Sequence, residues 1–349
     1  MKEIKIADVK IGSEQPCFVI AEAGVNHNGE VELAKQLVDA AVEAGVDAVK
    51  FQTFNADRVV SAEAPKAAYQ KDTTGTEETQ LEMVKQYELS PEAHRELQSY
   101  SHKKDILFIS IPFDRGSVDL LDEMGVPIYK IGSGEITNWP LLEYIARKNK
   151  PIIMSTGMSY LSEVGEAVRV IRDTGNDQLA LMHCVSNYPA DLSDVNLRSM
   201  VTMRTAFQIP VGYSDHTTGI EVALAAVALG ACAIEKHFTL DKNLPGPDHS
   251  ASLNPVELGH LVKGIRLVES SLGDGLKRPK ESEFENRLIV RRSLAAGINI
   301  PQGTKITSDM LLMLRPGSGI SPTNLDIVVG RDVKHPIEKG NLVNWEDLR

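Results

Sequence analysis

Apolar and polar positions alternate along the chain as short and long segments up to about residue 272. The short segments are nearly continuous runs of Val, Ile, Leu and Phe, which is typical of parallel β-strands buried on both faces. The longer segments, such as 31–45, repeat apolar residues every three or four positions and predict amphipathic helices. The expected strands lie at 17–24, 48–53, 106–113, 128–134, 151–157, 179–184, 210–216 and 233–238.

This succession of about eight strand–helix units predicts an α/β fold of the TIM type, a closed (β/α)8 barrel. An open, doubly wound sheet is the alternative. No Gly-x-Gly-x-x-Gly motif follows the first expected strand, which weakens that alternative.

The chain changes character after residue 275. Residues 276–286 are charged and carry a proline, which is typical of a linker. From Ile289 onward, short strand patterns are separated by Gly- and Pro-bearing turns. A domain of about sixty residues has a thin core, so we expect it to lean on something larger. The sequence thus predicts a barrel at 1–275, a linker at 276–286 and a small β-rich domain at 287–349.

Composition limits the partners and the compartment. The chain of 349 residues has a net charge of −11, which argues against a nucleic acid as partner because such proteins gather Lys and Arg. No stretch is apolar and long enough to span a bilayer, and the N-terminal sequence has no hydrophobic signal-peptide core. Cys17, Cys184 and Cys232 are odd in number and lie in apolar runs. We therefore expect reduced cysteines and a cytoplasmic protein.

Two lysines interrupt expected strands close to the ends at which TIM barrels carry their active sites. Lys50 and Lys130 are each followed by an amide or hydroxyl side chain, which favours an anionic ligand such as phosphate. An unpaired ammonium in an apolar strand costs several kcal/mol. The alternatives are pairing with a nearby Glu, extension to the rim, or a Schiff-base lysine. Neutral donors to the same anion would be Ser133, Ser155, Ser186 and Ser214.

His216 and His237 stand at equivalent positions on two consecutive expected strands. Neighbouring strands lie about 4.8 Å apart, so the two imidazoles could share one metal ion. Two nitrogens with open positions suit Mn, Fe, Co or Mg-like chemistry better than a closed zinc site. Asp215 and Glu235 would orient the rings. The alternative is that each histidine takes part only in an ordinary hydrogen-bond network.

The other histidines are expected to be structural or exposed. His27 follows the first expected strand in a loop, and His183 lies on an apolar strand as a core residue with a satisfied hydrogen bond. The remaining five have the character of surface or loop positions: His94, His102, His249, His260 and His335.

Eight separated motifs, in order over nearly the whole chain, resemble the sialic acid synthase family: AEAGVNHNG, VKFQT, FISIPF, YKIGSGEITN, PIIMSTGM, VGYSDHT, AIEKHFTLDKNLPGPDH and RPGSGISP. The resemblance implies the same two-part layout, a TIM barrel followed by an antifreeze-like (SAF) domain. It also implies a reaction that condenses phosphoenolpyruvate with N-acetylmannosamine or a related hexose to give a nine-carbon ulosonic acid and phosphate.

The resemblance implies roles for individual residues. His216 and His237 resemble metal ligands, most often for Mn²⁺, with Mg²⁺ or Co²⁺ as alternatives. The residues that resemble the phosphoenolpyruvate site are Lys50, Lys130, Ser133, Ser155 and Ser214. Those that resemble the sugar site are Gln52, Phe113, Glu135, Tyr188 and Asp248. Arg315 resembles an arginine that the small domain contributes to the partner subunit's sugar site, which implies a domain-swapped homodimer.

Three departures from the family pattern concern the substrates. Ile111 stands where a Thr would help to hold the phosphate, and Ser186 stands where some members place an Asn on phosphoenolpyruvate. Asp191 ends a segment that reads YPxP in the family. The loop 64–80 has no clear counterpart of a sugar-binding Asn, for which Thr73 and Thr74 are candidates. The reaction type is unaffected, but the identity of the sugar is left open.

The expected activity is that of N-acetylneuraminate synthase. The alternative acceptor is a 2,4-diacetamido hexose, as in the synthesis of N,N'-diacetyllegionaminate or pseudaminate. Glu135 would carry the proton transfers or only bind a hydroxyl, and Glu22 would orient water or ligand. A metal-independent Schiff-base aldolase and a carbohydrate-binding module belong to other classes, and a chelator would separate all three.

Overall fold

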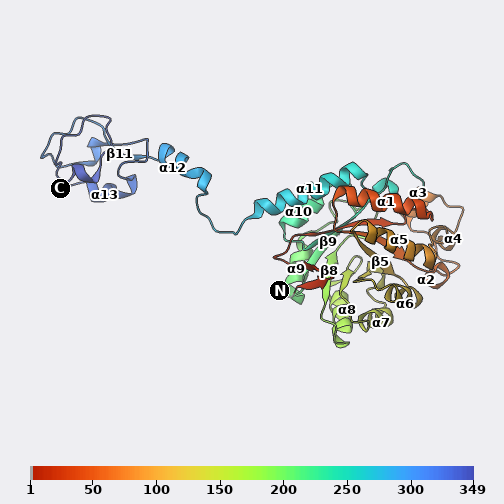
Figure 1. Cartoon of the computed structure of the whole chain (residues 1–349). Helices are drawn as coiled ribbons and strands as arrows, with labels where there is room; N and C mark the ends of the chain where they lie inside the picture. Colours follow the sequence, from red (N-terminus) through yellow and green to blue (C-terminus); the bar gives the residue numbers. More distant parts are fainter. Residues whose placement is uncertain (1–2) are drawn as a thin grey trace. The chain divides into compact units, whose positions relative to one another are not determined.

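The structure, a computed structural model, describes residues 3–349 apart from the side chains of Tyr69, Asp72 and Thr73. Thr73, one of the two candidates for a missing sugar contact, thus lies outside the described side chains. The chain divides into two compact units, Met1–Gly273 and Asp274–Arg349 (Figure 1).

Eight parallel strands build the first unit. They are β3 (Phe18–Gly24), β4 (Ala48–Thr53), β5 (Leu107–Pro112), β6 (Tyr129–Ile131), β7 (Ile152–Ser155), β8 (Leu179–His183), β9 (Val211–Asp215) and β10 (Ala233–His237). The first of them, β3, pairs with β4 on one side and with the last, β10, on the other. This pairing of first and last strand makes a nearly closed barrel, so the predicted TIM fold is confirmed and the open sheet is excluded.

Successive residues of a strand point to opposite sides, and this alternation separates the barrel interior from the helix-covered outside. On β3, Phe18 and Ile20 belong to the interior cluster, whereas Val19 and Ala21 pack with the helices. From the other strands the interior cluster takes Ala48, Ile109, Ile153, Ala180, Met182 and Ala233, together with Ile128 directly before β6.

Two residues further along the strands, the side chains that point into the barrel interior are mostly polar or charged instead of apolar. They are Glu22, Lys50, Ile111, Lys130, Ser155, Cys184, Ser214 and Glu235. All eight line one cavity. The period of the strands therefore places a polar and charged layer directly above an apolar one.

An antiparallel hairpin of β1 (Ile4–Ile6) and β2 (Val9–Ile11) precedes the barrel. Ile4, Ile6 and Ile11 join the interior cluster and are at most 1% exposed. The hairpin therefore packs against the apolar layer, at the end of the barrel opposite the cavity.

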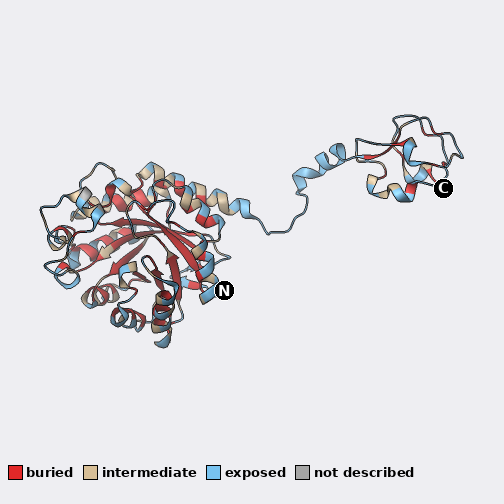
Figure 2. Cartoon of the chain, turned by 180° about the vertical axis from the view of Figure 1, so that it is seen from behind, coloured by how far each residue is buried: buried red, intermediate tan, exposed pale blue. Residues whose placement is uncertain are grey.

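Helices cover the outside of the barrel (Figure 2). The longer ones are α1 (Val31–Ala44), α5 (Pro91–Lys103), α6 (Arg115–Glu123), α7 (Trp139–Ala146), α8 (Leu161–Asp173), α9 (Arg198–Phe207), α10 (Glu221–Ala228) and α11 (Pro255–Leu272). The predicted helix at 31–45 is α1, and Gly45 ends it with a left-handed φ of 77°. No helix within residues 3–349 is long and apolar enough to cross a membrane.

The connection from β4 to α5 holds three short helices: α2 (Ala56–Val59), α3 (Ala68–Thr74) and α4 (Gln80–Lys85). Lys66, with a side chain only 2% exposed, stabilises this segment by contacting several of its polar groups. Its Nζ donates to Thr74 Oγ1 at 2.9 Å and to the carbonyl oxygen of Gly75 at 3.1 Å, and lies 2.8 Å from Glu78 Oε1. Thr74 is thus engaged in holding the segment together.

The second unit is small, as the sequence predicts. Its helices and strands are α12 (Phe284–Val290), β11 (Ser293–Ala296), β12 (Leu311–Leu314) and α13 (Leu325–Val328). β11 and β12 pair in antiparallel fashion, and the unit has its own core around Leu294, Ile306 and Val343. α12 begins inside the expected linker, and Ile289 lies in the last turn of this helix instead of opening a strand. Its β-branched side chain favoured the strand interpretation, but the preceding residues complete a helical turn.

Candidate active site

The carboxyl end of the barrel holds a polar cavity of about 480 Å³. Besides the charged layer it is lined by residues from the strand ends and following loops: Gln52, Phe113, Ser133, Ser186, Tyr188, His216 and His237. Ala67, Gln70 and Gln80 add a wall from the segment between β4 and α5. The cavity thus brings together most of the residues singled out from the sequence. Glu135, Asp248, Asp215 and Thr74 are not in its described lining, and Arg315 belongs to the second unit.

Two lysines and two carboxylates form a buried network in this cavity. Lys50 Nζ lies 2.7 Å from Glu22 Oε2 and 3.5 Å from Glu235 Oε1. Lys130 Nζ lies 3.5 Å from the same oxygen of Glu235. All four side chains are at most 5% exposed. Both lysines therefore lie near a carboxylate, and pairing with a nearby Glu was the alternative to anion binding that the sequence left open. The carboxylate nearest to Lys130 is, however, more distant than the one nearest to Lys50.

The pKa values distinguish the two cations. Burial lowers the pKa of Lys130, and repulsion from Lys50 adds to this effect although Glu235 opposes it. Against the same burial, Glu22 and Glu235 raise the pKa of Lys50. Burial also raises the pKa of Glu22 to about 7, whereas Lys130 and Lys50 overcome burial and lower the pKa of Glu235 to about 2. Lys130 is the less compensated cation, and a further anion beside it would stabilise its charge.

Two hydroxyl groups extend this network. Ser155 Oγ accepts a hydrogen bond of 2.6 Å from Lys130 Nζ. Ser214 Oγ donates to Glu235 Oε1 at 3.0 Å. A cation and a hydroxyl in contact provide the charge and the donor that a phosphate or carboxylate group requires.

Ser133 and Ser186 meet near Gly157. The backbone N–H of Gly157 donates to Ser133 Oγ at 2.9 Å. A Cβ atom at Gly157 would collide with Ser186 Oγ and Cys184 Sγ, so the glycine allows this close approach. Ile111 lines the same cavity with an apolar side chain, where the family pattern has a hydroxyl donor.

His216 and His237 approach each other as the strand register predicted, with ring centroids 5.6 Å apart. His216 Nδ1 lies 2.6 Å from the carbonyl oxygen of Val185 and must donate to it, which leaves the lone pair on Nε2. His237 Nδ1 is buried without a hydrogen-bond partner among the described residues, and Asp248 Oδ2 lies 3.8 Å away. Burial lowers the pKa of both rings, that of His216 to about 4.

This pair fits a divalent metal ion. Neutral imidazoles with available lone pairs are the form in which histidine binds metals, and one buried nitrogen of His237 makes no hydrogen bond to any described residue. Within the described part of the chain, no group of three or more His, Cys, Asp and Glu has a metal-holding arrangement. A metal bound to His216 and His237 would therefore complete its shell with water or substrate oxygens.

Asp215 does not orient a histidine ring, contrary to the expectation from sequence. Its carboxylate accepts from Lys236 Nζ and from Thr217 Oγ1, each at 2.8 Å. Strand alternation explains the difference, because Asp215 points to the side opposite Ser214 and His216. Glu235 belongs to the lysine network described above.

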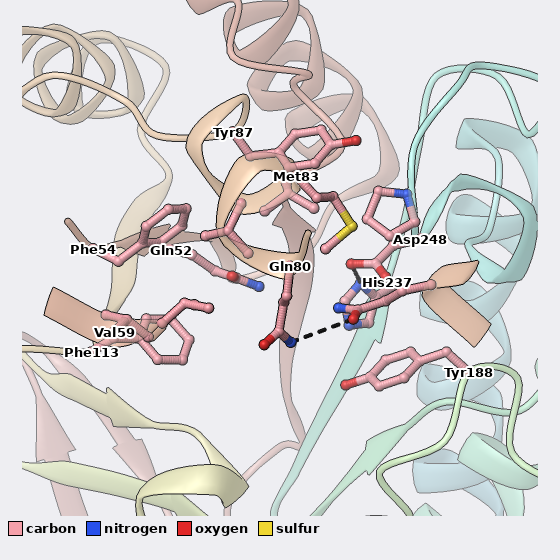
Figure 3. A pocket seen from close by; sticks show the side chains of 15 residues that line it. Gln52, Phe54, Val59, Gln80, Met83, Tyr87, Phe113, Tyr188, His237 and Asp248 are labelled. Atoms are coloured by element: carbon pink, nitrogen blue, oxygen red, sulfur yellow. Dashed lines mark hydrogen bonds and ion pairs between the residues drawn. The ribbon is translucent and has the colours of Figure 1, made fainter. Parts of the chain in front are cut away.

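A smaller pocket of about 230 Å³ adjoins the cavity (Figure 3). We call it the side pocket. Its boundary with the cavity is formed by Gln52, Gln70, Gln80, Phe113, Tyr188 and His237. Beyond this boundary it is lined by Val25, Phe54, Val59, Val60, Met83, Val84, Tyr87, Pro247 and Asp248. Asp248, expected to contact the sugar, thus lies in the side pocket, and burial raises its pKa to about 6.

Three of the expected sugar contacts lie elsewhere. Glu135, on the short helix η1 (Ser133–Glu135), is not in the described lining of either pocket, and its Oε2 accepts from Asn138 Nδ2 at 2.7 Å. Arg315 is an exposed residue directly after β12 in the second unit. Thr74 borders a surface depression with Glu78 and is also outside the described lining of the cavity.

Two histidines that we expected at surface or loop positions are buried. His94 is 1% exposed, with its ring nitrogens 3.0 Å from the carbonyl oxygen of Ser90 and 3.2 Å from that of Gln52. His249 is fully buried on η2 (His249–Ala251) and contacts Thr239 Oγ1 at 2.6 Å. Both sit beside polar residues in the sequence, so their tertiary partners could not be recognised from the local pattern. His183 is satisfied as expected, with Nε2 2.7 Å from the carbonyl oxygen of Val195.

Comparison with known proteins identifies relatives over the full length. The model of the NeuB family matches residues 37–277, and that of the SAF domain matches residues 291–349. An N,N'-diacetyllegionaminic acid synthase of Legionella pneumophila is 48% identical over 97% of this chain and 96% of its own. The human N-acetylneuraminate-9-phosphate synthase is 37% identical over 96% of this chain and 94% of its own.

A solved structure agrees with these relatives. The N-acetylneuraminic acid synthetase of Leptospira borgpetersenii superposes with a TM-score of 0.74, at 38% identity, over 82% of this chain and 95% of the other. Of these relatives, the one with the higher identity is the N,N'-diacetyllegionaminic acid synthase, the type of synthase that the sequence left as the alternative.

Proposed function

Because the chain belongs to the NeuB family and carries a SAF domain, we propose that it condenses phosphoenolpyruvate with an N-acetylated amino sugar to a nine-carbon ulosonic acid and phosphate. The acceptor we propose is a 2,4-diacetamido hexose, which gives N,N'-diacetyllegionaminic acid, with N-acetylmannosamine as the second candidate. One observation carries the proposal: a single cavity combines two buried lysines with two neutral histidines.

Phosphoenolpyruvate would bind over the lysine layer. Lys130 and Ser155 would hold one anionic group, because Lys130 is the less compensated cation and already orients the hydroxyl. Lys50, which lies as close to Glu235 as Lys130 does, would hold the second group. Further donors would come from Ser133, Ser186 and Ser214.

The sugar would lie above this layer, with its aldehyde beside the histidines. His216 and His237 would hold a divalent cation, with Mn²⁺ as the first candidate and Mg²⁺ or Co²⁺ as alternatives, which would polarise the aldehyde when bound. Gln52, Phe113 and Tyr188 would contact the sugar, since all three border both pockets.

In the reaction, C3 of phosphoenolpyruvate attacks the aldehyde carbon and a new C–C bond forms. Water adds at C2, and phosphate leaves as the C–O bond breaks. We assign the proton transfers first to Glu22, which lines the cavity and whose pKa of about 7 lets it accept and donate near neutrality. Glu135 is the second candidate, and its carboxylate would first have to break its hydrogen bond with the Asn138 amide.

We further propose a cytoplasmic, domain-swapped homodimer. The three cysteines are free and buried, which supports a reducing compartment. Arg315 is exposed on the small unit and has the reach and the donors to contact a sugar bound in a partner subunit.

Incubation with phosphoenolpyruvate and each sugar tests the function. We expect one phosphate released per nine-carbon acid identified by mass, faster with the 2,4-diacetamido hexose, and loss of turnover after chelation. Phosphate release from neither sugar would refute the proposal. Undiminished turnover in chelator, with a pyruvate adduct trapped by borohydride, would indicate a Schiff-base aldolase instead.

A further inference from the structure

The side pocket has an apolar inner wall. Val25, Phe54, Met83 and Tyr87 are at most 9% exposed and form one packed cluster, whereas Val59 is 39% exposed at its edge. Val59 on α2 and Met83 on α4 belong to this wall, and the loops after β3, β4 and α4 supply Val25, Phe54 and Tyr87. A water-filled pocket of this composition would be unfavourable, because apolar walls leave water without hydrogen-bond partners.

The mouth of the side pocket is polar. Figure 3 shows the amide groups of Gln52 and Gln80 between the apolar side chains and His237. Gln80 Nε2 lies 3.5 Å from Gln70 Oε1, a long hydrogen bond that a ligand could replace. Asp248, which also lines the side pocket, adds a carboxylate acceptor.

An acylamino group matches this combination. Its methyl group suits the apolar wall, its carbonyl oxygen accepts from a Gln amide, and its N–H donates to a carboxylate or an amide oxygen. A hydroxyl group at the same place could form hydrogen bonds at the polar mouth, but it would leave the apolar wall in contact with water.

The position on the sugar follows from His237, which borders both pockets. With the aldehyde carbon C1 of the sugar beside the histidines, the substituent on C2 remains close to the histidines. A substituent further along the carbon chain of the sugar can then extend into the side pocket. Building on the proposed function, we propose that the side pocket binds the acylamino group at C4 of the acceptor, so that Met83 and Val59 select a 2,4-diacetamido hexose over N-acetylmannosamine.

The test compares both sugars in three variants. Met83→Gln places an amide against the expected methyl group and should lower kcat/KM for the 2,4-diacetamido hexose about 10-fold to 100-fold. Val59→Thr keeps the shape of the side chain but makes it polar, and the position is exposed, so the variant should stay folded. It should lower kcat/KM for the 2,4-diacetamido hexose about threefold to tenfold. Leu81→Ala removes an apolar side chain from the same helix as Met83 but outside the described lining of the side pocket, and should change it less than about twofold.

Selectivity is the decisive readout. For Met83→Gln and Val59→Thr, kcat/KM for N-acetylmannosamine and the KM for phosphoenolpyruvate should stay within about threefold of wild type. N-acetylmannosamine is measured as a competitive inhibitor if its turnover is too slow to follow. Equal losses for both sugars, or none in Val59→Thr, would overturn the inference while the proposed function stands. If the wild-type enzyme releases phosphate with neither sugar, the proposed function is wrong and the inference fails with it.

Discussion

Lys130 Nζ donates a hydrogen bond of 2.6 Å to Ser155 Oγ, from one barrel strand to the next. Both side chains point into the interior, one step above Ile128 and Ile153 of the apolar cluster. The strand period alone therefore sets an ammonium and a hydroxyl side by side at the base of the cavity. Four predictions concern this site and its partners.

The first prediction concerns the anion. Lys130→Met should raise the KM for phosphoenolpyruvate about 10-fold to 100-fold, because a hydrogen bond between charged groups contributes about 1.5–3 kcal/mol. The KM for the sugar should change little. Lys150→Met serves as control, since Lys150 is paired with Asp122 outside the cavity. Equal increases in both KM values would assign Lys130 a structural role.

The second prediction concerns the metal. His216→Ala and His237→Ala should each lose the bound metal after dialysis and lower turnover at least about 100-fold, while thermal unfolding shows a folded protein. Metal content per chain, measured by elemental analysis, is independent of activity. His183→Gln is the matched control, because His183 lies on β8, the strand next to β9, and contacts the backbone carbonyl of Val195 in the following loop. Full turnover by a metal-stripped wild-type enzyme would contradict the assignment.

The third prediction concerns pH. Burial raises the pKa of Glu22 to about 7, so the carboxyl group is mainly protonated at pH 6 and mainly ionised at pH 8. If the ionised form accepts the proton of the attacking water, kcat/KM should rise about tenfold between these pH values. Glu22→Gln should remove this rise, whereas Glu135→Gln should keep it. The reverse result would assign the proton transfers to Glu135.

The fourth prediction concerns Arg315. Arg315→Ala should raise the KM for the sugar or lower turnover without changing the affinity for phosphoenolpyruvate. Mixing this variant with His216→Ala tests the domain swap directly. In a mixed dimer with crossed sites, one site has both residues and the other has neither, so activity should return. If mass spectrometry confirms subunit exchange and activity stays absent, Arg315 acts on its own barrel.

The barrel and much of its site could be predicted because they depend on strand alternation. Near-continuous apolar strands indicated the fold, and polar residues at the strand ends indicated the cavity. The pairing of His216 with His237 followed from their equivalent positions on neighbouring strands. The same rule, applied to Asp215, would have shown that it points away from the cavity.

Other features depend on contacts between distant segments. Glu235 bridges two lysines, Lys50 and Lys130, from separate strands, and the sequence does not show how far a lysine side chain extends inside a barrel. The side pocket needs three short helices whose few residues give no clear period. Glu135 follows a strand as an active-site residue would, but a 3₁₀ turn determines its direction.

The N-terminal hairpin packs Ile4, Ile6 and Ile11 beneath the layer of Lys50 and Lys130. Substrates must then enter from the carboxyl end of the barrel. An anion over the lysines would lie deeper than a sugar aldehyde at the histidines, which stand two residues further along their strands. A sugar already in place would block the anion, so steady-state kinetics should show compulsory order, with phosphoenolpyruvate leading and excess sugar inhibiting. A hairpin that contacts neither substrate would thereby determine the sequence in which they bind.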